Sequence, residues 1–227
     1  MTQTPGTKKK LDNRYLIGLA IASAVNFAAH VAISPFMPDQ LPIHWNAAGQ
    51  IDGYGSKLAV LLLDLLPLVM VLLFRVVPSI DPKRDNYEKF WRVWKGFVVG
   101  MTIFFIALSW TSELYAFNLV TEGSNFITIF VLGGLGLLFI ILGNYMPCVR
   151  QNYTFGAKTP WALDDERTWQ RTQRMCGIVF IIIGITMILM GMLGASSQIP
   201  FVVGGSVIGG TVWIYVYSYL VFRGTLR

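Results

Sequence analysis

Six long runs of apolar residues divide this chain, and they constrain its fold more than any other feature of the sequence. Each run has about 19 to 24 residues, and about 20 residues of α-helix cross the hydrocarbon core of a bilayer. The runs cover residues 15–34, 58–77, 96–117, 126–144, 175–193 and 199–222. They predict an all-α integral membrane protein with about six transmembrane helices.

The composition agrees with a membrane protein and argues against a soluble domain. Hydrophobic residues make up 54% of the chain, charged residues make up 13%, and the mean hydropathy is +0.56. A soluble domain has about 25% charged residues and could not cover so much apolar surface with so few charges. The net charge of +6 does not indicate a nucleic-acid binder, because the basic residues lie in short segments between the apolar runs. We therefore expect no direct contact with nucleic acid.

The distribution of basic residues predicts the orientation in the membrane. Of the 18 Lys and Arg residues, all except Lys57 lie near the two termini or around the second and fourth connections. Positive residues accumulate on the cytoplasmic side of membrane proteins. Both termini are therefore predicted to be cytoplasmic, and the chain is expected in the cell membrane as a multi-pass protein. One outer loop and two inner loops are long enough to be structured.

The loop lengths indicate two units. Residues 1–77 form a unit with two helices and the extracellular loop 35–57. Residues 78–227 form a four-helix unit with the cytoplasmic loop 145–174. The other inner loop, 78–95, has an aromatic stripe that is typical of an interfacial helix, with basic residues able to reach the headgroups. The stripe consists of Tyr87, Phe90, Trp91 and Trp94.

Three ionisable residues lie inside the predicted spans near the outer face. Asp64 is about two turns deep, and a carboxyl group inside a membrane span is a functional hypothesis by default. His30 and Glu113 lie at a similar depth, and Asn26 lies one turn deeper. We predict that Asp64 is paired with His30 or Lys57. A buried network that fixes helix packing and a site that handles protons or ions both remain open.

The outer loop combines turn residues with side chains suited to recognition. It carries His44, Trp45, Asp52 and Lys57 within a short segment. We expect these residues to join the intramembrane polar residues in one cluster that opens outward. Neither cysteine has a neighbouring His or Cys at zinc-ligand spacing, so neither a metal nor a cofactor is predicted. The common hydrolase and nucleotide-binding motifs are missing as well, and we predict that the chain is not an enzyme.

The inner loop 145–174 has more amide, aromatic and turn residues than a simple connection needs. Asp164 is predicted to cap a helix that continues into the fifth span, with Glu166 in its first turn. Trp161 and Trp169 are expected at the level of the headgroups. The sequence therefore predicts an ordered platform, which serves either as a brace or as a docking surface.

Pairs of small residues at four-residue spacing predict close helix packing. The pairs are Gly96 and Gly100, Gly205 and Gly209, and Ser206 and Gly210. Packing within one chain explains them, and a homodimer interface is the other interpretation.

Two motifs connect the chain to a known family. The inner motif consists of Gly143, Asn144, Tyr145, Pro147, Asn152, Tyr153, Gly156, Lys158, Thr159, Pro160, Trp161, Leu163, Glu166, Trp169, Thr172 and Arg174. The outer motif consists of Pro42, His44, Trp45, Gly49, Asp52, Gly53 and Lys57. The inner motif resembles the SdpI family of bacterial membrane proteins. The outer motif resembles the small domain of unknown function that often precedes it.

The resemblance implies a membrane immunity protein that protects its cell against a secreted antimicrobial peptide toxin. It also implies signalling, in which a transcriptional repressor is drawn to the cytoplasmic face. The outer residues expected to receive the toxin are His30, His44, Trp45, Asp52, Lys57, Asp64 and Glu113. A small proton-coupled transporter that uses Asp64 and His30 is the main alternative. A membrane-embedded hydrolase that uses His44 and carboxylates is the third interpretation.

Overall fold

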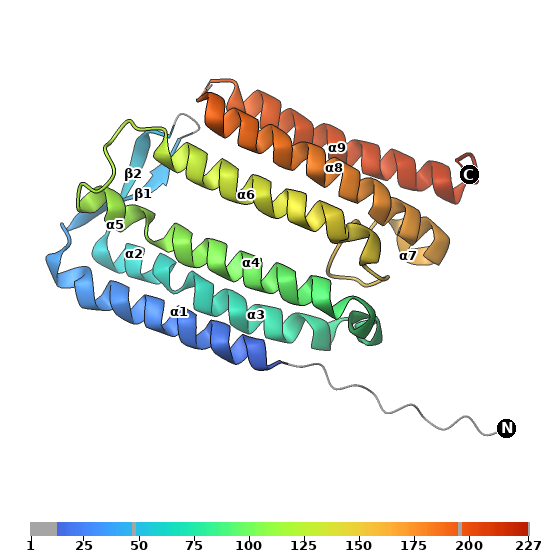
Figure 1. The fold of residues 1–227 in the computed structure, drawn as a ribbon, viewed down its shortest axis with the longest axis horizontal. Helices are drawn as coiled ribbons and strands as arrows, with labels where there is room; N and C mark the ends of the chain where they lie inside the picture. The colour runs from blue at the N-terminus through green and yellow to red at the C-terminus, as the bar shows by residue number, and fades with distance from the viewer. Residues whose placement is uncertain (1–12, 47–48, 195–196, 227) are drawn as a thin grey trace.

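The computed structural model describes residues 13–46, 49–194 and 197–226 as a helical bundle with one small sheet (Figure 1). The helices that form the spans are α1 (Arg14–Ile33), α2 (Lys57–Asp64), α3 (Leu66–Ile80), α4 (Trp91–Ser109), α5 (Thr111–Ala116), α6 (Phe126–Tyr145), α8 (Glu166–Leu193) and α9 (Ile199–Phe222). Shorter elements are η1 (Ser34–Phe36), η2 (Arg84–Phe90), η3 (Met146–Cys148), α7 (Pro160–Asp164) and the strands β1 (Gln40–Trp45) and β2 (Ile51–Ser56). Among the described residues, 6 segments are long and apolar enough to cross a membrane, which confirms the prediction.

The loops separate cleanly between the two ends of the bundle. The β1–β2 hairpin and α5 lie at one end, while α7 and the start of α1 lie at the other (Figure 1). The loops that the sequence analysis assigned to the cytoplasm therefore share one end. Which end faces the cytoplasm stays a prediction from the distribution of positive charge.

Cysteine labelling in intact cells tests this orientation. The exposed residue Gln50 represents the hairpin end, and the exposed residue Lys158 represents the other end. Cys148 is exposed and is first replaced by serine, whereas Cys176 is buried. We expect a membrane-impermeant maleimide to label Gln50→Cys from outside and to label Lys158→Cys only after permeabilisation. Labelling of Lys158→Cys in intact cells would reverse the orientation.

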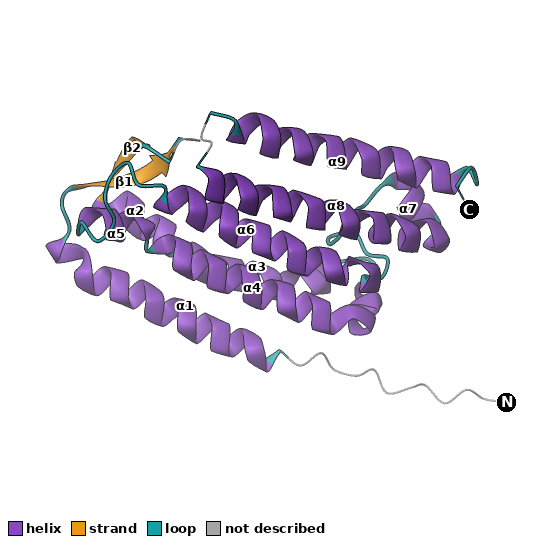
Figure 2. Ribbon diagram, turned by 45° about the horizontal axis from the view of Figure 1, so that its top comes forward, coloured by secondary structure: helices purple, strands orange, loops and turns teal. Residues whose placement is uncertain are grey.

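The outer loop folds as an antiparallel hairpin, a form that the sequence analysis did not specify (Figure 2). Gln40 pairs with Ser56 and Trp45 pairs with Ile51, with a register shift on each side of His44. Leu41 is fully buried, and side chains alternate in exposure along β2. This alternation is typical of a strand with one face packed on the bundle.

Two spans that the sequence predicts as continuous helices are broken in their outer halves. The 57–80 span breaks at Leu65, between α2 and α3. Pro67 has no N–H to donate and its ring crowds the preceding turn, which explains this break. The other break is at Trp110, between α4 and α5. There the hydroxyls of Ser109 and Thr111 donate to helix carbonyls at 2.8 Å, and such bonds bend helices.

Glycines bring α6 and α8 into close contact. A Cβ atom added at Gly136 would lie 2.6 Å from the carbonyl oxygen of Gly184, and one at Gly143 would lie 2.6 Å from that of Gly177. Small residues of this kind let helix backbones approach in lipid.

The glycine pairs chosen from the sequence do not make this contact. An added Cβ atom at Gly96, Gly205 or Gly209 would meet no heavy atom of the described residues within 4 Å. Gly100 approaches the side chain of Leu138, and Gly210 approaches the side chains of Val179 and Ile183, so neither contacts a backbone carbonyl. The four-residue spacing therefore does not identify the contact between α6 and α8, whose glycines lie seven residues apart in each helix, and a homodimer interface stays a prediction.

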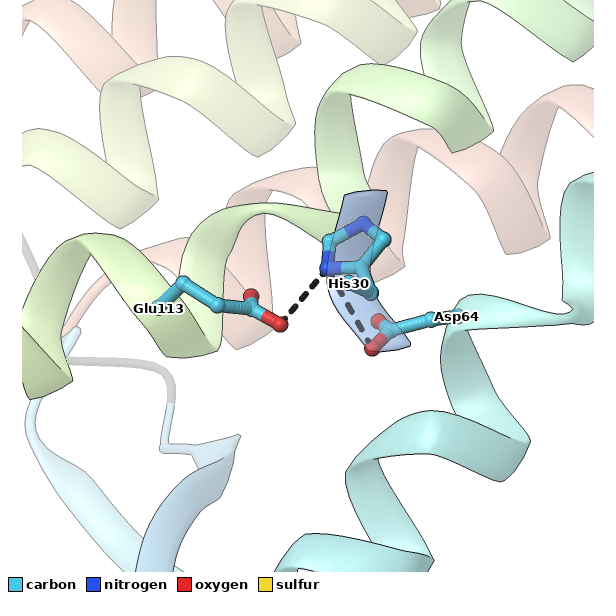
Figure 3. Close-up of side chains that lie close together, drawn as sticks. All are labelled: His30, Asp64 and Glu113. Carbon is cyan, nitrogen blue, oxygen red and sulfur yellow. Dashed lines mark hydrogen bonds and ion pairs between the residues drawn. The ribbon is translucent and has the colours of Figure 1, made fainter. Parts of the chain in front are cut away.

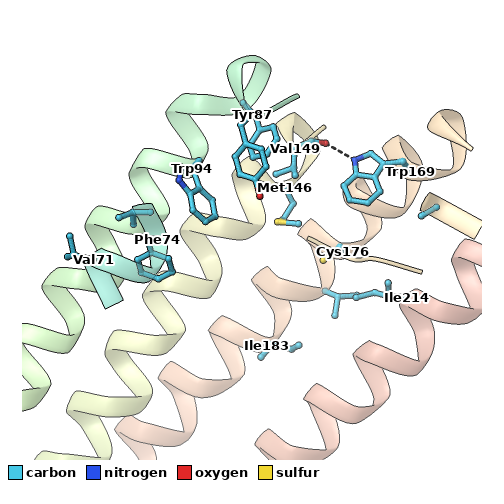
Figure 4. Close-up of a cluster of buried hydrophobic side chains, with 14 of the residues drawn as sticks. Val71, Phe74, Tyr87, Trp94, Met146, Val149, Trp169, Cys176, Ile183 and Ile214 are labelled. Atoms are coloured by element: carbon cyan, nitrogen blue, oxygen red, sulfur yellow. Dashed lines mark hydrogen bonds between the residues drawn. The ribbon is translucent and has the colours of Figure 1, made fainter. Parts of the chain in front are cut away.

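Three of the four aromatic residues in the stripe of the 78–95 loop are buried and Trp91 is half-buried, so the predicted interfacial helix is wrong. Tyr87, Phe90 and Trp94 have at most 2% of their surface exposed. They pack with Phe74 and Phe155 in the core at the inner end of the bundle, shown in part in Figure 4. The segment forms the 3-10 helix η2 and then enters α4 directly. It therefore closes the core instead of lying on the membrane.

Candidate functional site

Three ionisable side chains meet in the outer half of the bundle (Figure 3). His30 comes from α1, Asp64 is the last residue of α2, and Glu113 comes from α5. The Nδ1 atom of His30 lies 2.7 Å from Glu113 Oε1 and 3.4 Å from Asp64 Oδ2. No side chain of this triad is more than 2% exposed. The predicted pairing of Asp64 with His30 is thus present in the structure.

Both helix breaks lie beside the triad. Asp64 directly precedes the break at Leu65, and Glu113 belongs to the short helix that follows the break at Trp110. Discontinuous helices at membrane depth are typical of substrate and ion sites, since the irregular backbone must line a cavity or be covered by protein.

A chain of hydrogen bonds orients the imidazole of His30. Trp110 Nε1 donates to Asn26 Oδ1 at 2.8 Å, and Asn26 Nδ2 donates to Ser109 Oγ at 3.1 Å. The hydroxyl of Ser109 uses its own hydrogen toward the carbonyl of Ile106. Ser109 Oγ can therefore only accept from His30 Nε2, which lies 3.1 Å away. This arrangement places a hydrogen on Nε2 and directs Nδ1 at the carboxylates.

A cavity of about 430 Å³ lies next to the triad. Asp64 and Ser109 are in its wall, and His44 and Trp45 of the hairpin line it as well. The remaining lining is mostly apolar and comes from α2, α4, α6 and the residues beside them, including Leu63, Phe105, Leu108, Val131 and Leu132. A mostly apolar cavity with a few polar groups is the usual form of a ligand site.

The exposed residues of the hairpin form a separate group, so the prediction of a single polar cluster is wrong. His44 Nδ1 lies 2.6 Å from Asp52 Oδ1, and the two side chains are 70% and 43% exposed. Lys57 pairs with the exposed residue Asp39 at 3.4 Å, not with Asp64. Trp45 packs against Tyr115, with ring centroids 5.5 Å apart. His44 and Asp52 therefore stand at the surface, Trp45 is half-buried, and the cavity connects His44 and Trp45 with Asp64.

At the inner end, Asn152 holds the 145–174 loop in shape. Its Nδ2 donates to the carbonyls of Arg150 and Phe155 at 2.8 and 2.9 Å. Its Oδ1 accepts from the amides of Thr154 and Phe155 at 3.0 and 2.6 Å. The side chain is fully buried, so one amide satisfies four backbone groups of the loop.

Asp81, which the sequence analysis did not select, ties the two inner loops together. Its Oδ2 accepts from Tyr153 N at 2.9 Å and from Thr154 Oγ1 at 3.0 Å. Its Oδ1 accepts from the amide of Lys83 at 2.8 Å. The carboxyl group is 2% exposed. The Asp-Pro pair in a charged loop was the signal that could have identified it.

Several other motif residues are buried structural groups. Thr159 caps α7 by accepting from Ala162 N, and its hydroxyl bonds Ser218 Oγ of α9 at 2.5 Å. Trp169 is fully buried and donates to the carbonyl of Val149 at 2.9 Å (Figure 4). Trp169 therefore lies in the core and not at the headgroups, as the sequence analysis expected.

The cap of α8 is shifted by one residue from the prediction. Asp165, not Asp164, is the N-cap, and its Oδ2 accepts from Thr168 N at 2.6 Å. Hydrogen bonds from the Thr168 hydroxyl and amide lower the pKa of Asp165. Because the pKa is lower in the folded state, this stabilisation is present at neutral pH and is lost as the pH falls through the folded pKa. Glu166 lies in the first turn of α8, as predicted, and makes no ion pair with another described residue.

The other motif residues lie mostly at the surface of the platform. Trp161 is half-buried and packs on Tyr219, with ring centroids 5.2 Å apart. The exposed residues are Asn144, Tyr145, Pro147, Tyr153, Lys158, Pro160, Glu166 and Arg174. The motif thus divides into a buried part, which braces the helices, and an exposed part.

Comparison with known proteins finds two matching families. Residues 149–218 match the SdpI/YfhL protein family. This region begins at Val149, which accepts the hydrogen bond of Trp169, and ends at Ser218, which bonds Thr159. Residues 21–71 match a domain of unknown function, DUF1648, and include His30 and Asp64.

The chain also resembles a protein whose role is recorded in its name. It is 23% identical to Immunity protein SdpI of Bacillus subtilis (strain 168) over 164 residues, which cover 72% of this chain and 75% of that protein. No solved structure matches the chain. With its six apolar spans and this similarity, the chain is a multi-pass protein of the cell membrane. The division into units 1–77 and 78–227 stays a prediction, although each unit contains one of the two family matches.

Proposed function

We propose that this protein gives its cell immunity against a secreted, membrane-active peptide toxin, which it binds at the outer end of the bundle. The similarity to an immunity protein supports this function. The observation that carries it is the cavity of about 430 Å³ beneath the hairpin. The cavity combines an apolar wall with two side chains of the hairpin, His44 and Trp45.

The chemistry of the cavity suits an apolar peptide with some polar groups. Apolar side chains of the toxin would occupy the space lined by Phe105, Leu108 and Leu132. The exposed His44–Asp52 pair offers polar partners at the rim. Since His44 is 70% exposed, it can reorient without losing buried contacts. Retention of the toxin in this cavity would lower the amount that is free to act on the membrane.

A protection assay with a matched pair of variants tests the proposal. The chain is expressed in a sensitive bacterium, which is then challenged with a panel of membrane-active peptides. Leu63 lines the cavity and its neighbour Leu62 does not, although both are more than half exposed. We expect Leu63→Trp to reduce the tolerated peptide concentration about tenfold, as the loss of one good apolar contact would. Leu62→Trp should retain protection at equal membrane abundance.

Two outcomes would contradict this function. Cells with the native chain could tolerate no more of any peptide than cells with an empty vector. Alternatively, Leu63→Trp and Leu62→Trp could protect equally well, which would separate protection from the cavity.

We propose in addition that the exposed part of the inner motif binds a cytoplasmic protein, such as a transcriptional repressor. Lys158 and Arg174 are exposed at this surface. Lys158→Ala and Arg174→Ala should abolish signalling, while the purified variants melt at the native temperature. A loss of signalling that always matches an equal loss of folded protein would instead assign the motif to bracing alone.

Proton-coupled transport is the second candidate, and the buried triad beside two broken helices supports it. Reconstituted vesicles with an imposed proton gradient would separate the two functions. A transporter accumulates its substrate inside the vesicle, whereas a binding protein retains no more than one equivalent per chain.

A further inference from the structure

We propose that His30, Asp64 and Glu113 form a binding site for a divalent transition-metal ion of the Zn²⁺ or Mn²⁺ class. The inference stands apart from the immunity function, and it departs from the expectation of no metal. One ligand atom from each residue can be chosen so that all three lie within 4.8 Å of one another. The three residues come from separate elements that converge on one point (Figure 3).

Charge is the first reason for the assignment. Two carboxyl groups at this depth, 2% and 1% exposed, share a single imidazole as their partner among the described residues, and an imidazole is charged only when both ring nitrogens carry a hydrogen. The nearest lysine in the sequence, Lys57, is engaged with Asp39. Buried carboxylates need pairing or a metal ion, because burial of an unpaired charge is costly. A divalent cation would neutralise both carboxylates at once.

Unused acceptor atoms are the second reason. Asp64 Oδ2 and Glu113 Oε2 are buried and have no hydrogen-bond partner among the described residues. Buried polar atoms are nearly always satisfied in folded proteins, so each exception calls for an explanation. Two such oxygens in one triad indicate a ligand that accepts their lone pairs.

The tautomer of His30 is the third reason. The bond to Ser109 requires the hydrogen on Nε2, so in the neutral imidazole Nδ1 is a lone pair. This lone pair faces Glu113 Oε1 at 2.7 Å and Asp64 Oδ2 at 3.4 Å. Three acceptors directed at one point repel unless a cation or a shared proton lies among them. A hydrogen bond on the other ring nitrogen is also the usual support of a metal-bound histidine.

The donor set and the spacing select the class of ion. Zn²⁺ binds imidazole nitrogen and carboxylate oxygen at about 2.0 to 2.2 Å, so ligand atoms of a tetrahedral site lie about 3.4 Å apart. The distance of 3.4 Å between His30 Nδ1 and Asp64 Oδ2 fits this spacing, and Glu113 Oε1, at 2.7 Å from Nδ1, needs to move outward by a fraction of an ångström. Ca²⁺ and Mg²⁺ prefer oxygen ligands in larger number. Because Asp64 lines the cavity, an ion has a route to the site.

Metal uptake by the purified full-length protein tests the site. The protein in detergent is stripped with a chelator, dialysed against Zn²⁺, Mn²⁺ or Mg²⁺, and analysed by elemental mass spectrometry and calorimetry. We expect about one Zn²⁺ or Mn²⁺ per chain and no retained Mg²⁺. Co²⁺ should give the intense visible absorption of a tetrahedral site. His30→Ala and Glu113→Gln should weaken binding by a hundredfold or more, on the order of the loss of one ligand.

The second histidine of the chain provides the matched control. The sequence contains 2 histidines, and His44 also lies beside a carboxylate but is 70% exposed. His44→Ala should retain the full stoichiometry and the Co²⁺ spectrum. Ser109→Ala preserves all three ligands, so it should weaken binding about tenfold and should shift the spectrum without abolishing it. This variant remains informative if His30→Ala fails to fold.

Two results would overturn the proposal of a metal site. Less than about a tenth of an equivalent of every ion in the stripped native protein would show that protons alone neutralise the triad. Stoichiometric binding that persists in both His30→Ala and Glu113→Gln would place the metal elsewhere. Protection assays on cells do not enter this test, so its outcome is independent of the immunity function.

Discussion

Replacement of Gly143 by alanine should destabilise the protein by about 2 to 3 kcal/mol, although alanine is the better helix former. The added Cβ atom would lie 2.6 Å from the carbonyl oxygen of Gly177 and 2.7 Å from Ile181 Cγ1. The carbonyl belongs to the backbone of α8 and cannot rotate away, so the two helices must separate. Separation removes contacts along both helices, which is why one methyl group has a large effect.

Gly209→Ala is the matched control for this effect. An added Cβ atom at Gly209 in α9 would meet no heavy atom of the described residues within 4 Å. Its only expected effect is a small gain in helix propensity, about 0.5 to 1 kcal/mol. The apparent melting temperatures of both variants in detergent check the prediction. Equal melting temperatures for the two variants would mean that α6 and α8 do not pack as closely as the structure describes.

Asn152→Ala should destabilise the protein by about 3 kcal/mol and loosen the inner platform. The substitution removes four hydrogen bonds between one buried side chain and the backbone of the loop. Each bond contributes about 1 kcal/mol, and the unpaired backbone groups then have to find water. Asn152→Asp retains both acceptor contacts and loses both donor contacts, so it should fall between the native protein and Asn152→Ala.

Asn144 provides the control for the same change of residue type. It belongs to the same motif but is exposed, and its side chain donates only to the carbonyl of Ile140 within its own helix. Asn144→Ala should change the melting temperature little, because water replaces this bond. Limited proteolysis of the 145–174 loop gives a second measurement. An Asn152→Ala protein whose loop resists protease as well as the native loop does would contradict the bracing role.

The membrane spans were predictable from the sequence, but their interruptions and contacts were not. A run of 20 apolar residues reports solubility in lipid, and it reports little about the path of the backbone. Pro67 was visible as a helix breaker, yet proline also occurs within intact membrane helices. The contact between α6 and α8 could have been found from glycines seven residues apart, at 136 and 143 and at 177 and 184. Seven residues are about two helical turns, so these glycines share a face.

The triad was predictable because intramembrane ionisable residues are rare and lie at equal depth. The placement of His44 was not, because it depends on the register of the hairpin. In that register His44 lies opposite Gly53 and bonds Asp52, so its side chain is at the surface. Asp81 was not selected because its neighbours in the sequence do not reveal its hydrogen-bond partners. Its partners Tyr153 and Thr154 lie about 70 residues away in the sequence.

The glycine contact between α6 and α8 also governs how force can pass along the molecule. Backbones in direct contact at two levels cannot slide past each other, because each carbonyl occupies the space above the glycine opposite. We therefore expect the two helices to move as one rigid unit. A ligand bound against Val131 or Leu132 in the outer cavity would tilt α6 and α8 together. The opposite end of this unit is the inner part of α8, so a displacement in the outer half of the bundle would reach the inner platform without any helix changing its internal structure.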